Sequence, residues 1–157
     1  VEIHSNLFVT IAYLRGVVGI SKNPYLGTSQ LPIKSLMAVP YIRAAFEKQE
    51  LGLADLILTN VQLDVAETIS SNIFLFLNGQ WHTPQLQSGC IPGTMRQYVI
   101  DQFGGCQQPL QIRKIHSNEI PYIEAAFSTN ASGILIWTQT TFGSLNISIS
   151  EDCIKNL

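Results

Sequence analysis

Lys34 is the first residue of this sequence whose setting suggests chemistry. It stands in the apolar stretch LPIKSLMAVP, just after a loop rich in Gly, Pro, Ser and Asn. An apolar setting strips water from the ammonium and favours the neutral amine, which is the form that makes a Schiff base with a carbonyl. On the local sequence alone, a lysine that lies along apolar surface and reaches water with its ammonium is the commoner role.

Glu67 is a carboxylate next to apolar segments, in DVAETISSNIF. Burying it is costly unless it meets a cation or a hydrogen-bond donor. The proton of a protonated pyridine nitrogen would be such a partner, and Ser70, Ser71 and Asn72 are suited to turns and supporting hydrogen bonds. Taken alone, Glu67 also fits a solvent-facing position in a hairpin.

Gly93-Thr94-Met95-Arg96 follows a proline and resembles the start of a helix. Free backbone N–H groups and the helix dipole at such a start attract phosphate. Helices often begin after Pro-Gly, so this signal is weak by itself.

The surrounding sequence predicts the elements that position these residues. Apolar, β-branched runs predict strands at 6–14, 54–59 and 134–141, with a loop over 16–32. Asn78-Gly79 predicts a hairpin between strands at 72–77 and 80–83. Helices are expected at 40–49, 94–103 and 119–126, followed by a short strand or turn at 127–130, and Ser150-Glu151 is expected to cap a short terminal helix. This mixed order predicts an α+β fold with a largely antiparallel or mixed sheet, either open or closed into a barrel.

Composition excludes several classes of function. The chain is 46% apolar and 13% charged with a net charge of −2, which gives no electrostatic reason to expect nucleic acid or an anionic membrane. Few charges on an apolar chain also suggest a surface covered by another domain or subunit. Cys90, Cys106 and Cys153 form no CxxC pair, so neither a disulfide framework nor a zinc site is expected. Such cysteine usage predicts a reducing, cytoplasmic location. His4, His82 and His116 lack metal-ligand spacing.

Lys34, Glu67 and the helix start at Gly93-Thr94 occur in an order and at a spacing that can be compared with known families. The stretches IKSLMAVPYIRAAFEKQELGLADLILTN, AETISSNIFLFLNGQWHTP and LQSGCIPGTMRQYVI resemble the class IV aminotransferase family, the fold-type IV pyridoxal-phosphate (PLP) enzymes. That family includes branched-chain and D-amino-acid aminotransferases and aminodeoxychorismate lyases. Its pattern is met by Glu67, Asn72, Phe74, Thr83-Pro84, Pro92-Gly93 and Arg96, and the tail EIPYIEAAFSTNASGILIW is a weaker match.

The resemblance implies a role for each matched residue. Lys34 would be the Schiff-base lysine and proton shuttle, and Glu67 would pair with the pyridine nitrogen. Ile91 would pack on the ring. The phosphate would be held at Gly93, Thr94 and Met95 and by the turn that contains Ala131.

Four positions depart from the family pattern. Met95 stands where threonine is common, with a hydroxyl one place earlier on Thr94. Val39 replaces a tyrosine of the branched-chain enzymes, and Met37 replaces an asparagine of the D-amino-acid enzymes and lyases.

At the fourth position, Ala131 stands where serine or threonine is usual. Either Thr129 or Ser132 then takes over that contact, or the contact is absent.

The resemblance also implies an organisation. Residues 33–157 correspond to the larger, cofactor-binding domain, a mixed sheet or pseudo-barrel flanked by helices, and residues 1–32 to a joining strand and interdomain loop. A smaller N-terminal domain of the family is not found in this sequence, so the chain is expected to be a fragment. The expected partners are this missing domain, a second copy in a homodimer, and an amino acid or aminodeoxychorismate as substrate; nucleic acid, membrane and metal are not expected.

Three functions stay open at this point. The first is a PLP-dependent aminotransferase, the broader class, and the second is aminodeoxychorismate lyase, which releases pyruvate to give 4-aminobenzoate. The third is a non-catalytic PLP-binding or dimerisation fragment. A separate mechanism would make Cys90 a nucleophile with His82 or His116 as its base, although no residue is specified to orient that base.

Overall fold

The computed structural model describes residues 9–26, 38–103 and 109–157. Their strands are β1 (Ile11–Ile20), β2 (Asp55–Thr59), β3 (Val65–Thr68), β4 (Asn72–Leu77), β5 (Gln80–Pro84), β6 (Leu110–Arg113), β7 (Ala125–Asn130), β8 (Gly133–Thr140) and β9 (Gly143–Ser144). The helices are α1 (Ala38–Glu50), α2 (Thr94–Phe103) and α3 (Ile147–Lys155), with 3₁₀ turns η1 (Leu86–Ser88) and η2 (Ser117–Tyr122).

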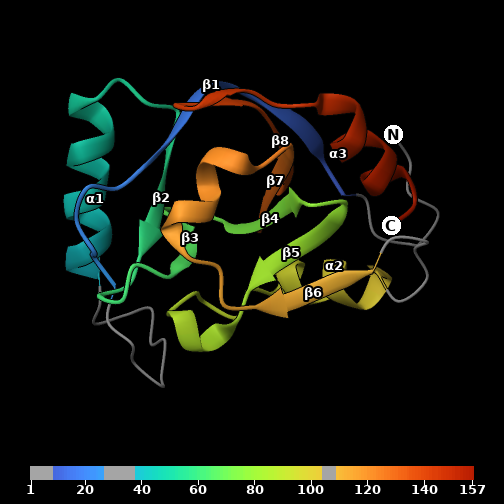
Figure 1. Ribbon diagram of the computed structural model, residues 1–157, viewed down its shortest axis with the longest axis horizontal. Helices are drawn as coiled ribbons and strands as arrows, with labels where there is room; N and C mark the ends of the chain where they lie inside the picture. Colours follow the sequence, from blue (N-terminus) through green and yellow to red (C-terminus); the bar gives the residue numbers. More distant parts are fainter. Residues whose placement is uncertain (1–8, 27–37, 104–108) are drawn as a thin grey trace.

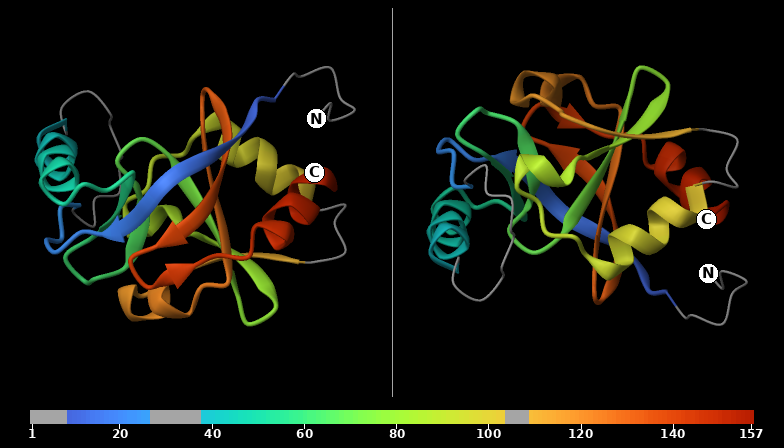
Figure 2. Two further views of the ribbon diagram at one scale, coloured as in Figure 1. Left: turned by 90° about the horizontal axis from the view of Figure 1, so that it is seen from above. Right: turned by 90° about the horizontal axis from the view of Figure 1, so that it is seen from below.

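Within these residues the strands form one nine-stranded mixed sheet in the order β3-β2-β1-β8-β7-β4-β5-β6, with β9 paired to β8. β1 runs parallel to both β2 and β8, β5 runs parallel to β6, and the other pairs are antiparallel. The sheet curls, and α1, α2 and α3 lie around it (Figures 1 and 2). This architecture confirms the predicted α+β class with a mixed sheet.

Several elements match their predictions closely. α2 covers residues 94–103 as expected, and β4 and β5 form the predicted hairpin. Its turn residues Asn78 and Gly79 have φ of 51° and 77°, the left-handed conformations that a tight hairpin needs. Gly52, with φ of 63°, follows the end of α1.

β1 corrects the prediction of a strand at 6–14 followed by a loop from Gly16. The described strand continues through Gly16 to Ile20 and lies in the middle of the sheet. Gly16 has φ of 108° and sits where the pairing with β8 shifts between Leu14 and Val17. A glycine inside a strand often marks such a bulge, and for this reason the predicted start of a loop at Gly16 is wrong.

Two helix predictions near the C-terminus are also wrong in their bounds. Residues 119–126 do not form one helix, because the 3₁₀ turn η2 ends at Tyr122 and β7 begins at Ala125. Glu119 and His116 form a capping box, which stabilises the first turn of a helix. Here that first turn leads only into a short 3₁₀ turn that contains Pro121. The terminal helix α3 begins at Ile147, so Ser150 lies inside it, where its hydroxyl donates to Ala126 O at 3.2 Å.

β4 packs into two cores at once, which explains its uninterrupted apolar sequence. Ile73, Leu75 and Leu77 belong to a cluster inside the curl of the sheet, together with Trp137 of β8. The alternate residues Phe74 and Phe76 belong to a second cluster, which α2 and α3 cover.

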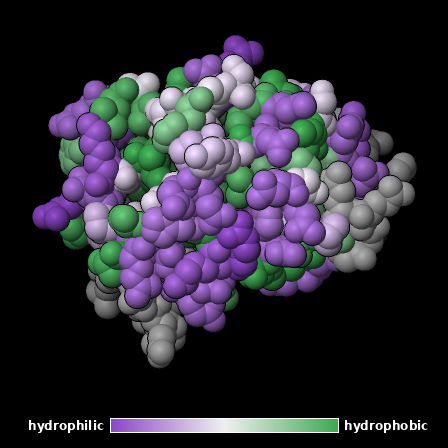
Figure 3. All heavy atoms as spheres, viewed as in Figure 1, coloured by the Kyte–Doolittle hydropathy of each residue, from purple (hydrophilic) through white to green (hydrophobic). Residues whose placement is uncertain are grey.

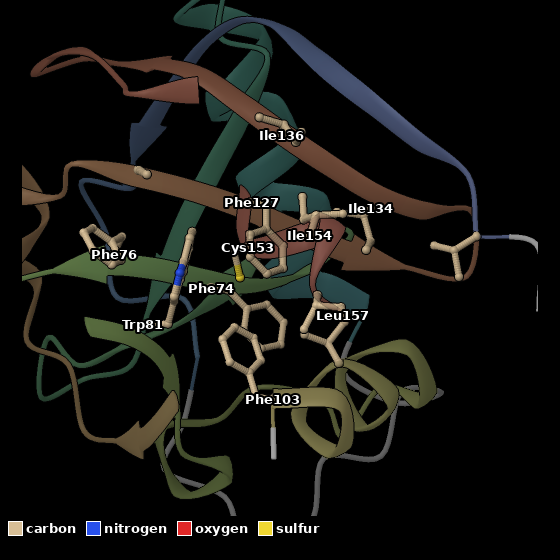
Figure 4. Close-up of a cluster of buried hydrophobic side chains, with 13 residues drawn as sticks. Phe74, Phe76, Trp81, Phe103, Phe127, Ile134, Ile136, Cys153, Ile154 and Leu157 are labelled. Carbon is tan, nitrogen blue, oxygen red and sulfur yellow. The ribbon is translucent and has the colours of Figure 1, made fainter. Parts of the chain in front are cut away.

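That second cluster is rich in aromatic rings (Figure 4). The rings of Phe74 and Phe127 stack with centroids 4.8 Å apart, and Trp81 lies 5.0 Å from Phe127. Phe103 of α2 and Ile154 of α3 join them, so both helices are anchored through apolar contacts. A third, smaller cluster lies under α1 and includes Ala44, Leu56 and Leu58.

Hydrophilic side chains cover much of the face shown in Figure 3, with hydrophobic ones between them. Large apolar side chains are exposed on α1, where Val39, Ile42 and Phe46 have exposed fractions of 59%, 53% and 63%. Among the described helices, none is long and apolar enough to cross a membrane.

Candidate active site

A cavity of about 470 Å³ lies among segments that are far apart in the sequence. Its walls come from the start of α1, the end of β3 with the turn that follows it, the first residue of β4, the start of α2 with the segment before it, and the turn between β7 and β8. Its volume falls within the range typical of small-molecule sites.

The cavity gathers most of the residues singled out from the sequence: Glu67, Ile91, Gly93, Thr94, Met95 and Ala131 all line it. Lys34 and Met37 lie outside the described residues. The structure therefore brings the carboxylate and both expected phosphate-side segments together, while their roles toward a cofactor stay predictions.

Glu67 reaches the cavity because of its position in β3. It pairs with Leu58 of β2, and the register of the two strands shifts immediately beyond that pair. Paired residues of antiparallel strands share a face. Leu58 packs in the cluster under α1, so Glu67 lies on the same outer face of the sheet.

The Glu67 side chain is only 3% exposed and is held by several donors. Its Oε2 accepts from the backbone N–H of Ile91 at 3.0 Å and from the Asn72 amide at 3.4 Å. Its Oε1 accepts from the hydroxyl of Tyr41 in α1. These contacts suit an ionised carboxylate, which can accept several hydrogen bonds at once.

Gly93 allows the chain before α2 to approach the start of β4. A Cβ placed on Gly93 would lie 2.3 Å from Asn72 Oδ1. The amide nitrogen of Asn72 donates to Ile91 O at 2.7 Å, so Asn72 fixes this segment from the other side. The close approach explains why glycine is needed here even though its φ is not in the left-handed region.

The first turn of α2 supplies the other functional side of the cavity. Thr94 and Met95 line the cavity at the N-terminus of this ten-residue helix. The first N–H groups of an α-helix have no partner within the helix and carry its positive partial charge. A carboxylate in one wall and a helix start in another suit a ligand with both a protonated nitrogen and an anionic group.

The turn between β7 and β8 completes the wall. Asn130 donates to Ser71 Oγ at 3.0 Å and accepts from Ser132 N at 2.8 Å, which ties this turn to the one after β3. Thr129 lines the cavity, and its buried hydroxyl has no hydrogen-bond partner among the described residues. Thr129 therefore stays a candidate for the contact that Ala131 lacks.

Cys90 is a poor nucleophile in this setting. It is 1% exposed, and burial raises the pKa of its thiol to about 11 despite the nearby Arg96 cation. Its sulfur contacts the carbonyl oxygens of Pro84 and Gln85 at 3.7 and 3.6 Å. The geometry favours a packing role over the thiol mechanism.

Both histidines considered as its base have other contacts. The ring of His82 lies 3.3 Å from Leu77 O and accepts at Nδ1 from Arg113 Nε at 3.0 Å. Burial, and then the Arg113 charge, lower the pKa of His82. His116 accepts from Asn118 N as part of its capping box.

Arg96 is structural rather than part of the cavity wall that the described residues form. It is 4% exposed, and its Nη2 donates to Pro84 O at 2.9 Å, which ties α2 to the end of β5. The contact with Pro84 positions α2, and this explains why the family pattern includes an arginine here.

Tyr41 is a cavity residue that the sequence analysis missed. The position compared with the family tyrosine is Val39, and the Val39 side chain is 59% exposed on α1. Tyr41 lies two places further along the same helix and lines the cavity. A tyrosine in the first turn of a helix carries no local signal that it will meet a carboxylate 26 residues away.

The fold is shared with PLP-dependent and related enzymes of known structure. A 4-amino-4-deoxychorismate lyase from Pseudomonas aeruginosa matches with a TM-score of 0.78 and 22% identity over 91% of this chain and 54% of that protein. A branched-chain aminotransferase from Thermoproteus uzoniensis with norvaline matches with a TM-score of 0.75 and 24% identity, over 90% and 51%. An aminotransferase from Brucella abortus bound to the cofactor PLP matches with a TM-score of 0.75 and 18% identity, over 88% and 52%.

The chain therefore spans about half the length of these proteins. A search among curated proteins found no match. The matching structures confirm the expected fold, that of fold-type IV aminotransferase domains.

The sequence comparison extends across most of the chain. The family model for amino-transferase class IV matches residues 19–138. This range contains both cavity-lining turns and the start of α2. The chain belongs to the class IV aminotransferase family.

Proposed function

We propose that the cavity binds PLP and that the protein is a PLP-dependent aminotransferase. PLP is the typical cofactor of this family. The observation that carries the proposal is that one cavity combines the buried carboxylate of Glu67 with the N-terminus of α2.

The residues fit the chemical groups of PLP. An ionised, multiply hydrogen-bonded Glu67 is suited to a protonated pyridine nitrogen, because the pair neutralises a charge that is costly to bury alone. The N–H groups of Thr94 and Met95 are suited to the phosphate. Ile91, which is half-buried in the wall between them, offers an apolar surface to the ring.

Each residue then has a defined task. When bound, PLP supplies a ring that withdraws electrons and so stabilises negative charge at the substrate α carbon. Glu67 keeps the proton on the pyridine nitrogen, and the start of α2 holds the phosphate end in place. Lys34, assigned from the sequence, is the proposed Schiff-base lysine, and its Nζ would take the proton from the substrate α carbon and return it to the C4′ carbon of the cofactor.

Aminodeoxychorismate lyase is the second candidate, because a lyase and a transaminase are both among the matching folds. The two reactions use the same binding residues and differ in which bond at the substrate breaks. Purified full-length protein should be assayed with a panel of L- and D-amino acids plus 2-oxoglutarate, and in parallel with aminodeoxychorismate. Keto-acid formation from an amino acid is the expected result. Activity on aminodeoxychorismate alone would instead identify the protein as a lyase.

A non-catalytic PLP-binding or dimerisation role is the third candidate. This role would use the same cavity, but no substrate in the panel would then be converted. A protein that stays colourless after incubation with PLP would favour a scaffold role and would remove the cofactor assignment as well.

The proposed partners are a second copy of the chain and a further domain that completes the substrate pocket. The exposed apolar side chains of Val39, Ile42 and Phe46 on α1 support the proposal that a partner covers this helix. The cavity walls supply groups suited to the cofactor, and we propose that a partner supplies contacts to the substrate.

A further inference from the structure

Tyr41 lines the cavity and donates its hydroxyl proton to Glu67 Oε1. None of the roles implied by the family resemblance falls on this position. We infer that Tyr41 is a positioning residue that keeps the Glu67 carboxylate ionised and aimed into the cavity. The consequence for the cofactor rests on the proposed function, while the effect on Glu67 itself does not.

Tyr41 is held in place independently of Glu67. It lies in the first turn of α1, and its half-buried side chain packs against the cluster under that helix. The phenol therefore approaches Glu67 from α1, while the Ile91 N–H and the Asn72 amide approach the other oxygen from the loop and β4. Both carboxylate oxygens therefore accept hydrogen bonds from separate elements, and such contacts restrict how the carboxylate can turn.

The phenol acts as a neutral donor. Burial, followed by the negative charge of Glu67, raises the pKa of Tyr41, so the hydroxyl keeps its proton throughout the working range of pH. Cys90, another acidic group that interacts with Glu67, also stays neutral because burial raises its thiol pKa to about 11. Arg96 of α2 is a nearby cation, and the Glu67 charge partly opposes the lowering of its pKa by burial.

Removing the Tyr41 hydroxyl would leave the Glu67 anion with one donor fewer. A carboxylate that loses a donor takes up a proton more readily. In the pair that Glu67 forms with a protonated pyridine, the shared proton would then move toward the carboxylate. The bound cofactor would lose part of the positive charge on which its chemistry depends.

Tyr41→Phe tests the inference, and Tyr25→Phe is a matched control. Tyr25 is also half-buried against the cluster under α1, and its hydroxyl also donates to a glutamate, Glu47 at 2.7 Å. Neither residue of that second pair lines the cavity that the described residues form. Thermal unfolding of both variants would show whether each keeps its fold.

The first readout uses cofactor-free protein. The side-chain ¹³C signal of Glu67, assigned by its loss in Glu67→Gln, is followed as pH is lowered. In Tyr41→Phe the midpoint of protonation should rise by roughly one pH unit, the effect of one hydrogen bond to a charged group. Tyr25→Phe should leave this midpoint unchanged. An unchanged midpoint in folded Tyr41→Phe would overturn the inference whether or not the protein binds PLP.

The second readout uses PLP labelled with ¹⁵N at the pyridine nitrogen. Tyr41→Phe should move the ¹⁵N signal toward that of the neutral ring and weaken PLP binding by roughly tenfold. Unchanged signal and affinity would contradict the role of Tyr41 while leaving the proposed function intact, and so would tighter binding, which would mean that the phenol occupies the place of the pyridine. If wild-type protein binds no PLP, the proposed function fails, and the cofactor-free titration still decides the role of Tyr41.

Discussion

Glu67 combines almost complete burial with donors on both of its oxygens. A substitution that keeps the shape of this side chain but removes its charge should therefore affect cofactor binding more than folding. Neighbouring residues also depend on one another: Asn72 contacts Glu67 and Ile91, and its oxygen lies where a side chain on residue 93 would go.

Glu67→Gln should weaken PLP binding by roughly 10- to 100-fold, because the neutral amide cannot offset the charge of a protonated pyridine. The side chain keeps its shape, so the variant should stay folded. Absorbance titration with PLP measures the affinity. Glu47→Gln is the matched control, since Glu47 also accepts several hydrogen bonds but is outside the described cavity wall. Equal losses in both variants would argue against a specific role for Glu67.

Gly93→Ala should lower both stability and PLP affinity, because its Cβ would lie 2.3 Å from Asn72 Oδ1 and must displace that amide. We expect a loss of about 1–3 kcal/mol in the free energy of unfolding, measured by urea denaturation. Gly19→Ala serves for comparison, because its Cβ would meet only the end of the Leu53 side chain, 2.5 Å away, which can rotate aside. If Gly93→Ala is no worse than Gly19→Ala, the close approach of these segments is not needed.

At this scale the sequence predicted types of residue better than contacts. Glu67, Thr94 and Met95 were found because family motifs and helix-start chemistry are local signals. The Tyr41 contact was missed because it joins a helix to a strand, and nothing within either segment specifies the other. The same holds for Asn130 and Ser71, which are 59 residues apart.

At the scale of elements, α2 is fixed by apolar contacts along its length and by Arg96 near its start. Val99 and Phe103 pack into the cluster shown in Figure 4, while Arg96 reaches Pro84 O. The position of the helix start relative to the cavity therefore depends on a buried arginine.

Arg96→Ala should reduce the free energy of unfolding by about 2–4 kcal/mol, because it leaves a void and removes the donor to a buried carbonyl. The neighbouring substitution Gln97→Ala is exposed, loses only a bond to Asp101 on the same helix, and should change stability by less than about 0.5 kcal/mol. Chemical denaturation compares the two. A similar small effect for both would show that Arg96 does not anchor α2.

The turn η2 depends on pH through Glu119. Arg113 lies 2.7 Å from Glu119 and lowers the pKa of its carboxyl below the ordinary value of 4.5. The pair therefore contributes its stability above pH 4.5, and that contribution is lost as pH falls through the lower pKa of the folded state. Both side chains are partly exposed, so the contribution is at most about 1 kcal/mol.

Glu119→Gln should thus be less stable than wild type at pH 7, and the difference should disappear at strongly acid pH. Denaturation curves at several pH values measure this. Asp152→Asn breaks an exposed pair with Lys155 at 3.9 Å and should have almost no effect at any pH. A Glu119→Gln difference that does not change with pH would contradict the assignment to this ion pair.

The errors in predicting elements have physical causes. The bulge at Gly16 was read as a loop because glycine inside a strand looks like a break. Residues 119–126 were read as a helix because the capping box at His116 and Glu119 is a genuine helix-start signal. The pairing of β7 with β4 and β8 overrides it, and that pairing is set by distant segments.

At the scale of the whole molecule, the curled sheet creates the site. β3, β4 and β7 bring the residues around positions 67, 72 and 130 together, and α1 and α2 complete the walls. Such non-local pairing leaves little local trace in a sequence. The fold class could be predicted from the mixed order of elements and the family resemblance, whereas the strand order and the place of β1 in the middle of the sheet could not.

The proposed function requires that this cavity hold PLP with Lys34 as the covalently linked lysine. The most direct measurement is to incubate full-length protein with stoichiometric PLP, reduce it with borohydride, digest it and locate the added mass by tandem mass spectrometry. We predict that the cofactor is attached to Lys34 and that Lys34→Ala carries none. Absence of label from wild type, or label on Lys22, Lys48, Lys114 or Lys155 instead, would contradict the assignment of Lys34.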